Sequence, residues 1–257
     1  MTTVSLGRPV FGLGSLHQIP THGARQRLLR QAFEIGFRAF DVAPAYGNGL
    51  NEVELGFALS QLRDTVEVTT KFGIPVELYG ERHRRLAFWI RVWRRVTRRA
   101  YGAEYGRRTF SAAEMVASLE GSLRRLRRDY IDDFMIHEPL GALDDALRAE
   151  LNATADRLRQ QGKIRRWGVA GPAASIVSLL GDPAIEVVQA PLDDLRRLAV
   201  GPRRRIAYNA YAAFRRSGSA EADDFAAFVR ARMQEGIDVI VATRRPETLA
   251  SFGALFA

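Results

Sequence analysis

Short apolar runs alternate along this chain with longer segments in which apolar residues recur every three or four positions. The short runs have the length of buried strands, whereas the longer segments have the period of amphipathic helices. The pattern predicts eight strands, at Val10–Gly14, Phe37–Ala43, Val66–Phe72, Tyr130–Glu138, Arg166–Ala170, Glu186–Ala190, Arg205–Tyr208 and Asp238–Thr243.

Helical segments lie between most of these strands. Ser111 is expected to be an N-cap, with Glu114 as its capping-box partner, and Gly162 is expected to end a helix. The clearest helices are predicted at Ala24–Ile35, Glu52–Leu62, Ala112–Leu126, Leu143–Gln161 and Ala222–Gln234, with a last helix beginning at Pro246.

The order of these elements predicts an α/β fold, a single (β/α)8 TIM barrel that spans residues 1–257. A doubly wound open sheet is the alternative. That fold would place a Gly-x-Gly-x-x-Gly turn after the first strand, where the chain has only Gly12-Leu13-Gly14. In a barrel, we expect the functional residues at the carboxyl ends of the strands.

Most of the net charge of +9 comes from Tyr79–Arg108, a stretch with a net charge of +8 within residues 74–109, which interrupt the barrel pattern after the third strand. Between Tyr79 and Arg108 there are ten arginines against Glu81 and Glu104. Apolar residues at helical spacing among these arginines predict an Arg-rich amphipathic helix, inserted at the active-site end of the barrel. They are Leu86, Trp89, Ile90, Trp93 and Val96.

This Arg-rich insertion has three interpretations. It is a lid whose tryptophans line the pocket, or an extra packed helix whose arginines face solvent. Alternatively, residues 82–99 attach to an acidic partner or to an anionic membrane surface. No nucleic-acid motif accompanies the charge, so we expect no specific nucleic-acid partner.

Composition excludes several classes of site. The chain has no cysteine, and therefore no disulfide, thiolate metal site or cysteine nucleophile. We expect no metal site. Met1–Gly7 lacks a basic stretch followed by an apolar one, and no apolar run reaches the length of a membrane span. We therefore expect a cytoplasmic protein; its oligomeric state does not follow from the sequence.

Four side chains suited to proton transfer lie at or near the ends of three successive strands: Asp41, Tyr46, Lys71 and His137. Lys71 stands out because Lys163 is the only other lysine in the chain. A free phenol has a pKa of about 10, which a nearby ammonium lowers by stabilising the phenolate. An aspartate holds the lysine, and a histidine donates a hydrogen bond to a carbonyl oxygen. These groups can protonate that oxygen while a cofactor supplies a hydride.

The motifs around these residues resemble those of the aldo-keto reductase family. Phe40 to Gly49 resembles the family's Asp/Tyr motif, Thr69 to Gly73 its lysine strand, and Asp129 to Pro139 its histidine strand. Gly162 to Arg165 and Trp167 to Val169 resemble the family's entry into the next strand. The resemblance covers nearly the whole chain outside the Arg-rich insertion.

The resemblance implies an NADPH-dependent oxidoreductase that interconverts an aldehyde or ketone and an alcohol. Tyr46 would be the general acid, Lys71 would lower the pKa of Tyr46, Asp41 would pair with Lys71, and His137 would orient the carbonyl. Small carbonyl compounds would be the substrates. The residues implied to bind NADPH are Gly14, Ser15, Asp41, Gln189, Tyr208, Asn209, Thr243, Arg244, Arg245 and Thr248.

Two departures from the family pattern keep alternatives open. Ala170-Gly171 stands where the family usually has a Ser-Asn pair for the carboxamide, and Ser251-Phe252 where it has an acid and an asparagine for the adenosine end. The chain also ends at Ala257, so no long C-terminal loop is expected. One alternative is a cofactor-free acid/base enzyme that catalyses elimination or isomerisation on the same barrel. The other is a non-catalytic binding subunit that acts through the Arg-rich helix.

Overall fold

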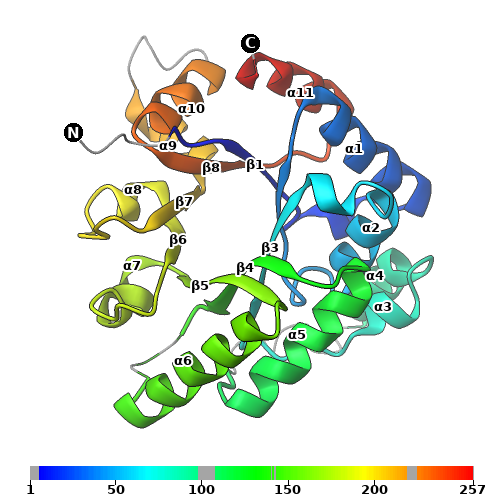
Figure 1. Ribbon diagram of the computed structural model, residues 1–257. Coiled ribbons are helices and arrows are strands. Elements are labelled where there is room, and N and C mark those ends of the chain that lie inside the picture. The colour runs from blue at the N-terminus through cyan, green and yellow to red at the C-terminus, as the bar shows by residue number, and fades with distance from the viewer. Residues whose placement is uncertain (1–5, 98–107, 140, 142, 219–224, 257) are drawn as a thin grey trace.

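The computed structural model describes residues 6–97, 108–139, 141, 143–218 and 225–256. In it, eight parallel strands close into a barrel in which each strand pairs with the next and β8 pairs with β1 (Figure 1). The predicted (β/α)8 fold is therefore confirmed. The strands are β1 (Pro9–Gly12), β2 (Ala39–Asp41), β3 (Glu67–Phe72), β4 (Ile131–His137), β5 (Ile164–Ala170), β6 (Val187–Pro191), β7 (Arg204–Tyr208) and β8 (Ile237–Val241).

Helices surround this barrel (Figure 1). The α-helices are α1 (His22–Ile35), α2 (Leu50–Ala58), α3 (Tyr79–Arg82), α4 (Ala87–Val96), α5 (Ala112–Leu126), α6 (Asp145–Gln160), α7 (Ala173–Ile176), α8 (Leu192–Leu195), α9 (Ala210–Ser217), α10 (Phe225–Gln234) and α11 (Pro246–Ser251). The 3₁₀ helices are η1 (Leu16–Gln18), η2 (Arg63–Thr65), η3 (Val177–Leu179) and η5 (Phe252–Leu255). None of the helices in the described part of the chain is long and apolar enough to cross a bilayer.

The predicted capping signals form, while some boundaries differ. Ser111 Oγ accepts a hydrogen bond from the backbone N–H of Glu114 at 3.2 Å, and Gly162 adopts a positive φ of 71° after α6. The second helix begins at Leu50, two residues before the predicted start, because Gly49 with a φ of 85° turns the chain into it. Short α7, α8 and α9 were not predicted. Of the predicted helix over 222–234, residues 222–224 lie outside the described part.

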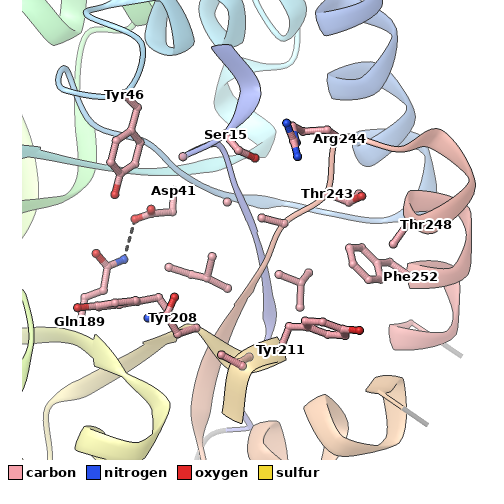
Figure 2. Close-up of a pocket in the computed structure, with 18 of the residues that line it drawn as sticks. Ser15, Asp41, Tyr46, Gln189, Tyr208, Tyr211, Thr243, Arg244, Thr248 and Phe252 are labelled. Atoms are coloured by element: carbon pink, nitrogen blue, oxygen red, sulfur yellow. Dashed lines mark hydrogen bonds between the residues drawn. The ribbon is translucent and has the colours of Figure 1, made fainter. Parts of the chain in front are cut away.

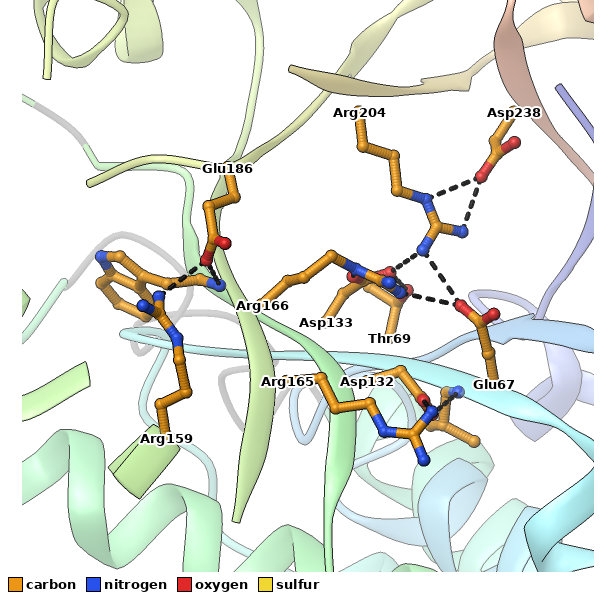
Figure 3. A network of polar contacts seen from close by, with 12 residues as sticks. Glu67, Thr69, Asp132, Asp133, Arg159, Arg165, Arg166, Glu186, Arg204 and Asp238 are labelled. Carbon is orange, nitrogen blue, oxygen red and sulfur yellow. Dashed lines mark hydrogen bonds and ion pairs between the residues drawn. The ribbon is translucent and has the colours of Figure 1, made fainter. Parts of the chain in front are cut away.

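Six charged residues link five strands at the amino-terminal end of the barrel, and Figure 3 shows five of them, all except Arg8. We call them the floor network: Arg8, Glu67, Asp133, Arg166, Arg204 and Asp238. Glu67 on β3 accepts from Arg8 at 2.8 Å and from Arg166 at 2.8 Å. Arg204 on β7 bridges Asp133 at 3.0 Å and Asp238 at 2.6 Å. Ion pairs therefore close the barrel end opposite the predicted functional end.

Candidate active site

Asp41 and Lys71 form a buried ion pair inside the barrel. Asp41 ends β2, and Lys71 lies near the end of β3, where its side chain is 1% exposed. Lys71 Nζ donates to Asp41 Oδ1 at 2.7 Å and to the backbone carbonyl of Val42 at 3.1 Å. Gln189 on β6 donates from Nε2 to the same Asp41 Oδ1 at 2.7 Å. One carboxylate thus receives hydrogen bonds from two other strands.

Tyr46 lies on the turn between β2 and α2, beside this pair. Lys71 Nζ is 5.1 Å from the centroid of the Tyr46 ring, and the rings of Tyr46 and His137 meet edge to face at 5.9 Å. Asn51 Nδ2 anchors the turn by donating to the Leu13 carbonyl at 2.6 Å. The structure therefore brings together the four residues predicted from strand ends.

Glu52, at the start of α2, ties this turn to the lysine strand. It is fully buried, accepts from Thr70 Oγ1 at 2.7 Å, and pairs with Arg125 of α5 at 2.6 Å. Thr70 immediately precedes Lys71. A buried carboxylate is tolerated here because both of its oxygens are bonded, and the arrangement fixes α2 against β3.

His137 ends β4 and is held neutral. Burial, followed by the charges of Lys71 and Arg108, lowers the pKa of His137 well below its ordinary value. A neutral imidazole has one N–H donor. At neutral pH His137 therefore has a single hydrogen-bond donor available beside the Tyr46 ring.

Arg108 and Glu138 were not predicted as site residues. Glu138 follows His137 with a positive φ of 47°, which is uncommon outside glycine. Arg108 pairs with its carboxylate at 2.7 Å and donates from Nε to its backbone carbonyl at 3.1 Å. The sequence signal was the charged residue that directly follows a strand-end histidine; its partner, 30 positions away, gave no local signal.

A cavity of about 930 Å³ opens over these residues at the carboxyl ends of the strands. Its size suits a ligand larger than a small carbonyl compound. Tyr46 and His137 line it, while Lys71 is buried behind Asp41. All ten residues predicted to bind a cofactor also line it: Gly14, Ser15, Asp41, Gln189, Tyr208, Asn209, Thr243, Arg244, Arg245 and Thr248.

The cavity extends from the Asp41–Tyr46 end to a basic end beyond β8. Figure 2 shows Asp41, Tyr46 and Gln189 on one side of the pocket, and Arg244 with Thr243 on the other. Arg244 donates to the Gln18 side chain. Among the described residues, neither Arg244 nor Arg245 is paired with a carboxylate, and both side chains line the cavity.

The residues that line the cavity show what surrounds Gly171 and Phe252, the positions of the two departures from the family pattern. A Cβ on Gly171 would lie 2.4 Å from Ser175 Oγ, so the Ser175 hydroxyl fills the space that a side chain at Gly171 would need. At the basic end, Phe252 lines the cavity and packs against Phe225, with ring centroids 6.2 Å apart. Tyr211 also lines the cavity and meets Phe225 edge to face at 5.4 Å. Aromatic rings therefore form part of this end of the cavity, beside the hydroxyl groups of Thr248 and Ser251.

The expectation that tryptophans of the Arg-rich insertion line the pocket is wrong, and residues 98–107 of the insertion lie outside the described part of the chain. Within its described parts, residues 74–97 and 108–109, no side chain lines the cavity, and Trp89 and Trp93 are exposed. Helix α4 lies near η1, where Arg91 acts on His17. Burial of His17, and after it the charge of Arg91, lowers the pKa of His17 to about 4. The helix therefore reaches the rim of the site without covering it.

The family model of the aldo/keto reductases matches residues 10–205, about three quarters of the chain. The chain belongs to the aldo/keto reductase family. It is 30% identical over 158 residues to the L-galactose dehydrogenase of Arabidopsis thaliana, a match that covers 60% of this chain and 40% of that protein. Over 169 residues it is 31% identical to the NADH-specific methylglyoxal reductase of Escherichia coli, covering 65% of this chain and 47% of that protein. The matches thus span about half the length of these two relatives or less.

Solved structures of the family share the fold of this aldo/keto reductase. The holo form of an aldo-keto reductase from Bacillus halodurans superposes with a TM-score of 0.73 at 19% identity, covering 98% of this chain and 87% of that chain. An aldo-keto reductase from Klebsiella pneumoniae in complex with NADPH gives a TM-score of 0.65 at 20% identity, covering 98% of this chain and 86% of that chain. At these identities the likeness shows the fold alone.

Proposed function

We propose that this protein is an NADPH-dependent oxidoreductase that interconverts an aldehyde or ketone and an alcohol, with Tyr46 as the general acid. The observation that carries the proposal is the buried Lys71–Asp41 pair beside Tyr46, at one end of a cavity. The other end of the cavity holds Arg244 and Arg245, which form no ion pair with any carboxylate of the described residues. The first feature suits protonation of an oxygen, and the second suits a phosphate group.

The protein's own residues supply the proton and orient the carbonyl group. Lys71 lies over the Tyr46 ring, where its positive charge would favour the phenolate formed when Tyr46 gives up its proton, and Asp41 holds Lys71 in place. The neutral His137 donates its N–H to the substrate oxygen beside Tyr46. In the reverse direction Tyr46 accepts the alcohol proton. When bound, the nicotinamide exchanges a hydride with the carbonyl carbon.

The lining residues fit an extended dinucleotide. Arg244 and Arg245 would hold a 2′-phosphate, because a guanidinium matches phosphate oxygens with paired N–H donors. The Tyr208 ring, half-buried near Asp41, would stack on the nicotinamide. Phe252 and Tyr211 would contact the adenine ring through their faces or edges, in place of the acid-Asn pair. Ala170 and Gly171 leave the carboxamide to Gln189.

Titration of the purified protein with NADPH and NADH, followed by calorimetry, tests the cofactor. The proposal expects saturable binding with preference for NADPH. Because two matched relatives are named methylglyoxal reductases, methylglyoxal is the first substrate for a screen of small aldehydes and ketones. Tyr46→Phe is expected to lower turnover by about 100-fold or more while leaving the NADPH dissociation constant unchanged. Tyr130→Phe, at the opposite end of β4, is the matched control.

A cofactor-free acid/base enzyme is the second candidate. The Gly171 and Phe252 positions favour it, because they remove side-chain hydrogen bonds that a nicotinamide cofactor would receive. Failure to bind either nucleotide, together with substrate turnover that Tyr46→Phe abolishes, would establish this candidate and exclude the oxidoreductase. Full biological activity of Tyr46→Phe would exclude both and favour the non-catalytic subunit.

A further inference from the structure

Helix α4 presents its apolar side to solvent. Among the described residues there are ten exposed large hydrophobic side chains, and five of them lie on or next to this one helix. Their spacing of three or four places them on one side of the helix. We call this side the outer face of α4: Leu86, Trp89, Val92, Trp93 and Val96.

The opposite side of α4 carries charge and packs on the protein. Ala87 is buried, and the Arg94 side chain pairs with Glu77 and lies over the Tyr79 ring, 4.7 Å from its centroid. The usual surface helix buries its apolar side and exposes its polar side. Here the orientation is reversed, so that Trp89 is 62% exposed and Val96 75% exposed. An exposed apolar patch of this kind marks an interaction surface.

Charge around the outer face identifies the kind of surface it meets. Arg82 and Arg85 are exposed just before α4, Arg98 and Arg99 follow it in sequence, and the whole stretch from Tyr79 to Arg108 has a net charge of +8. Two copies of this chain placed face to face would bring these like charges together. Tryptophans flanked by arginines instead match the boundary between lipid headgroups and acyl chains, where indole rings settle and long cations reach phosphates.

We propose that the outer face of α4 binds the surface of an anionic lipid bilayer. The helix lies in the plane of the membrane, with its apolar side chains among the upper acyl carbons and Arg82 and Arg85 at the lipid phosphates. Figure 1 shows α3 and α4 beside α2 and α5, at the periphery of the barrel. The outer face of α4 is separate from the cavity, because no described residue of the insertion lines the cavity.

Flotation of the full chain with vesicles tests this surface. The protein is expected to float with vesicles of phosphatidylcholine and phosphatidylglycerol in equal parts, and not with phosphatidylcholine alone. Trp89→Ser is expected to lower partitioning at least tenfold. Arg85→Glu is expected to lower it more than about fivefold, the factor that one basic side chain contributes near an anionic surface. Val177→Ser, which removes an apolar residue with 57% exposure elsewhere, and Arg215→Glu on α9 are the matched controls.

Tryptophan fluorescence gives a second readout. Trp167 is fully buried, so a blue shift on adding the mixed vesicles would report Trp89 and Trp93. Absence of flotation and of a shift would overturn the proposal, as would equal binding by Trp89→Ser and wild type. A concentration-dependent dimer that Trp89→Ser abolishes, without vesicle binding, would assign the face to a second copy and equally overturn it.

Discussion

Gln189 and Asp41 are hydrogen-bonded to each other across the barrel, at 2.7 Å between Nε2 and Oδ1. The same Asp41 oxygen accepts from Lys71. Residues from β6, β2 and β3 are therefore joined at one atom, and the amide that would face a nicotinamide is oriented by the carboxylate that also holds Lys71. If Gln189 contacts the cofactor and Lys71 assists proton transfer as proposed, a change at Asp41 is expected to affect both.

Variants of the Lys71–Asp41 pair are expected to change turnover and the free energy of unfolding by different amounts, so the two effects can be measured separately. Lys71→Met is expected to lower turnover by about 100-fold or more, because the Tyr46 phenolate loses its cation. It is also expected to lower the free energy of unfolding by about 3 kcal/mol, since Asp41 is left as a buried charge with only Gln189. Urea unfolding and steady-state kinetics measure the two effects.

The double variant Asp41→Asn/Lys71→Met is the control for this change. With both charges removed, most of the lost stability is expected to return while turnover stays low. Turnover of Lys71→Met close to wild type would contradict the role given to Lys71. Equal instability of the single and double variants would contradict the role given to the buried charge.

Arg244 and Arg245 are expected to distinguish NADPH from NADH. Both are exposed at the basic end of the cavity, so replacement by alanine does not disturb the core. A charged hydrogen bond contributes about 1.5–3 kcal/mol, so loss of the guanidinium that meets the 2′-phosphate is expected to weaken NADPH binding about 10- to 100-fold. NADH binding is expected to stay unchanged. Calorimetric titration of each single variant measures this, and equal weakening for both nucleotides would contradict it.

Three of the four proton-transfer residues were predictable from the sequence because each ends or directly follows its own apolar run, whereas Tyr46 lies on the turn after β2. Asp41, Lys71 and His137 follow that rule, and the barrel brings them together at one end. The floor network does not follow it. Arg8 precedes β1, and Asp238 lies 230 positions away on β8; the closure of β8 on β1 brings the two together, and the side chain of Arg8 also reaches Glu67 on β3.

The direction of α4 was also beyond prediction. The spacing of Trp89 and Val96 defines one apolar side of a helix, but periodicity alone does not say whether that side faces the core or the solvent. Helix α9 was missed for another reason. It is short, and its apolar residues, such as Ala213 and Phe214, did not form a pattern that stood out from the surrounding loop.

Two histidines are expected to make the fold less stable in mild acid. The pKa of His17 is lowered to about 4, and that of His137 well below its ordinary value, whereas both titrate near 6.5 when unfolded. Between these values the unfolded chain binds more protons than the folded one. The stability is therefore fully present above about pH 6.5 and is lost as the pH falls toward 4.

Urea unfolding at a series of pH values measures this effect. His17→Gln is expected to flatten the dependence between pH 6.5 and about 4. Two-dimensional NMR of the histidine rings is expected to show no titration of His137 near 6.5 in the folded protein. A ring that titrates there would contradict the neutral donor assigned to His137. His22, half-buried beside Glu54 at 2.7 Å, is a histidine whose replacement serves as a comparison.

The floor network is expected to contribute to stability but not to cofactor binding. Asp133 is buried and neutralises both Arg166 and Arg204, so Asp133→Asn leaves two arginines with less negative charge around them. We expect a loss of about 3 kcal/mol in the free energy of unfolding, the cost of breaking a buried pair. Asp156→Asn, which removes an exposed pair with Arg159, is expected to cost less than about 1 kcal/mol.

Calorimetric titration with NADPH tests whether the floor network, at the amino-terminal end of the barrel, affects cofactor binding at the opposite end. Because Asp133 lies near the amino end of its strand, NADPH affinity of Asp133→Asn is expected to match wild type where both are folded. Burial alone would raise the pKa of Glu67, but the hydrogen bond and charge of Arg8 hold it well below its ordinary value. The contribution of ionised Glu67 to the free energy of unfolding is therefore present above about pH 4.5 and is lost as the pH falls through the folded pKa of Glu67. Weakened NADPH binding with unchanged stability would contradict the assignment of this end to folding.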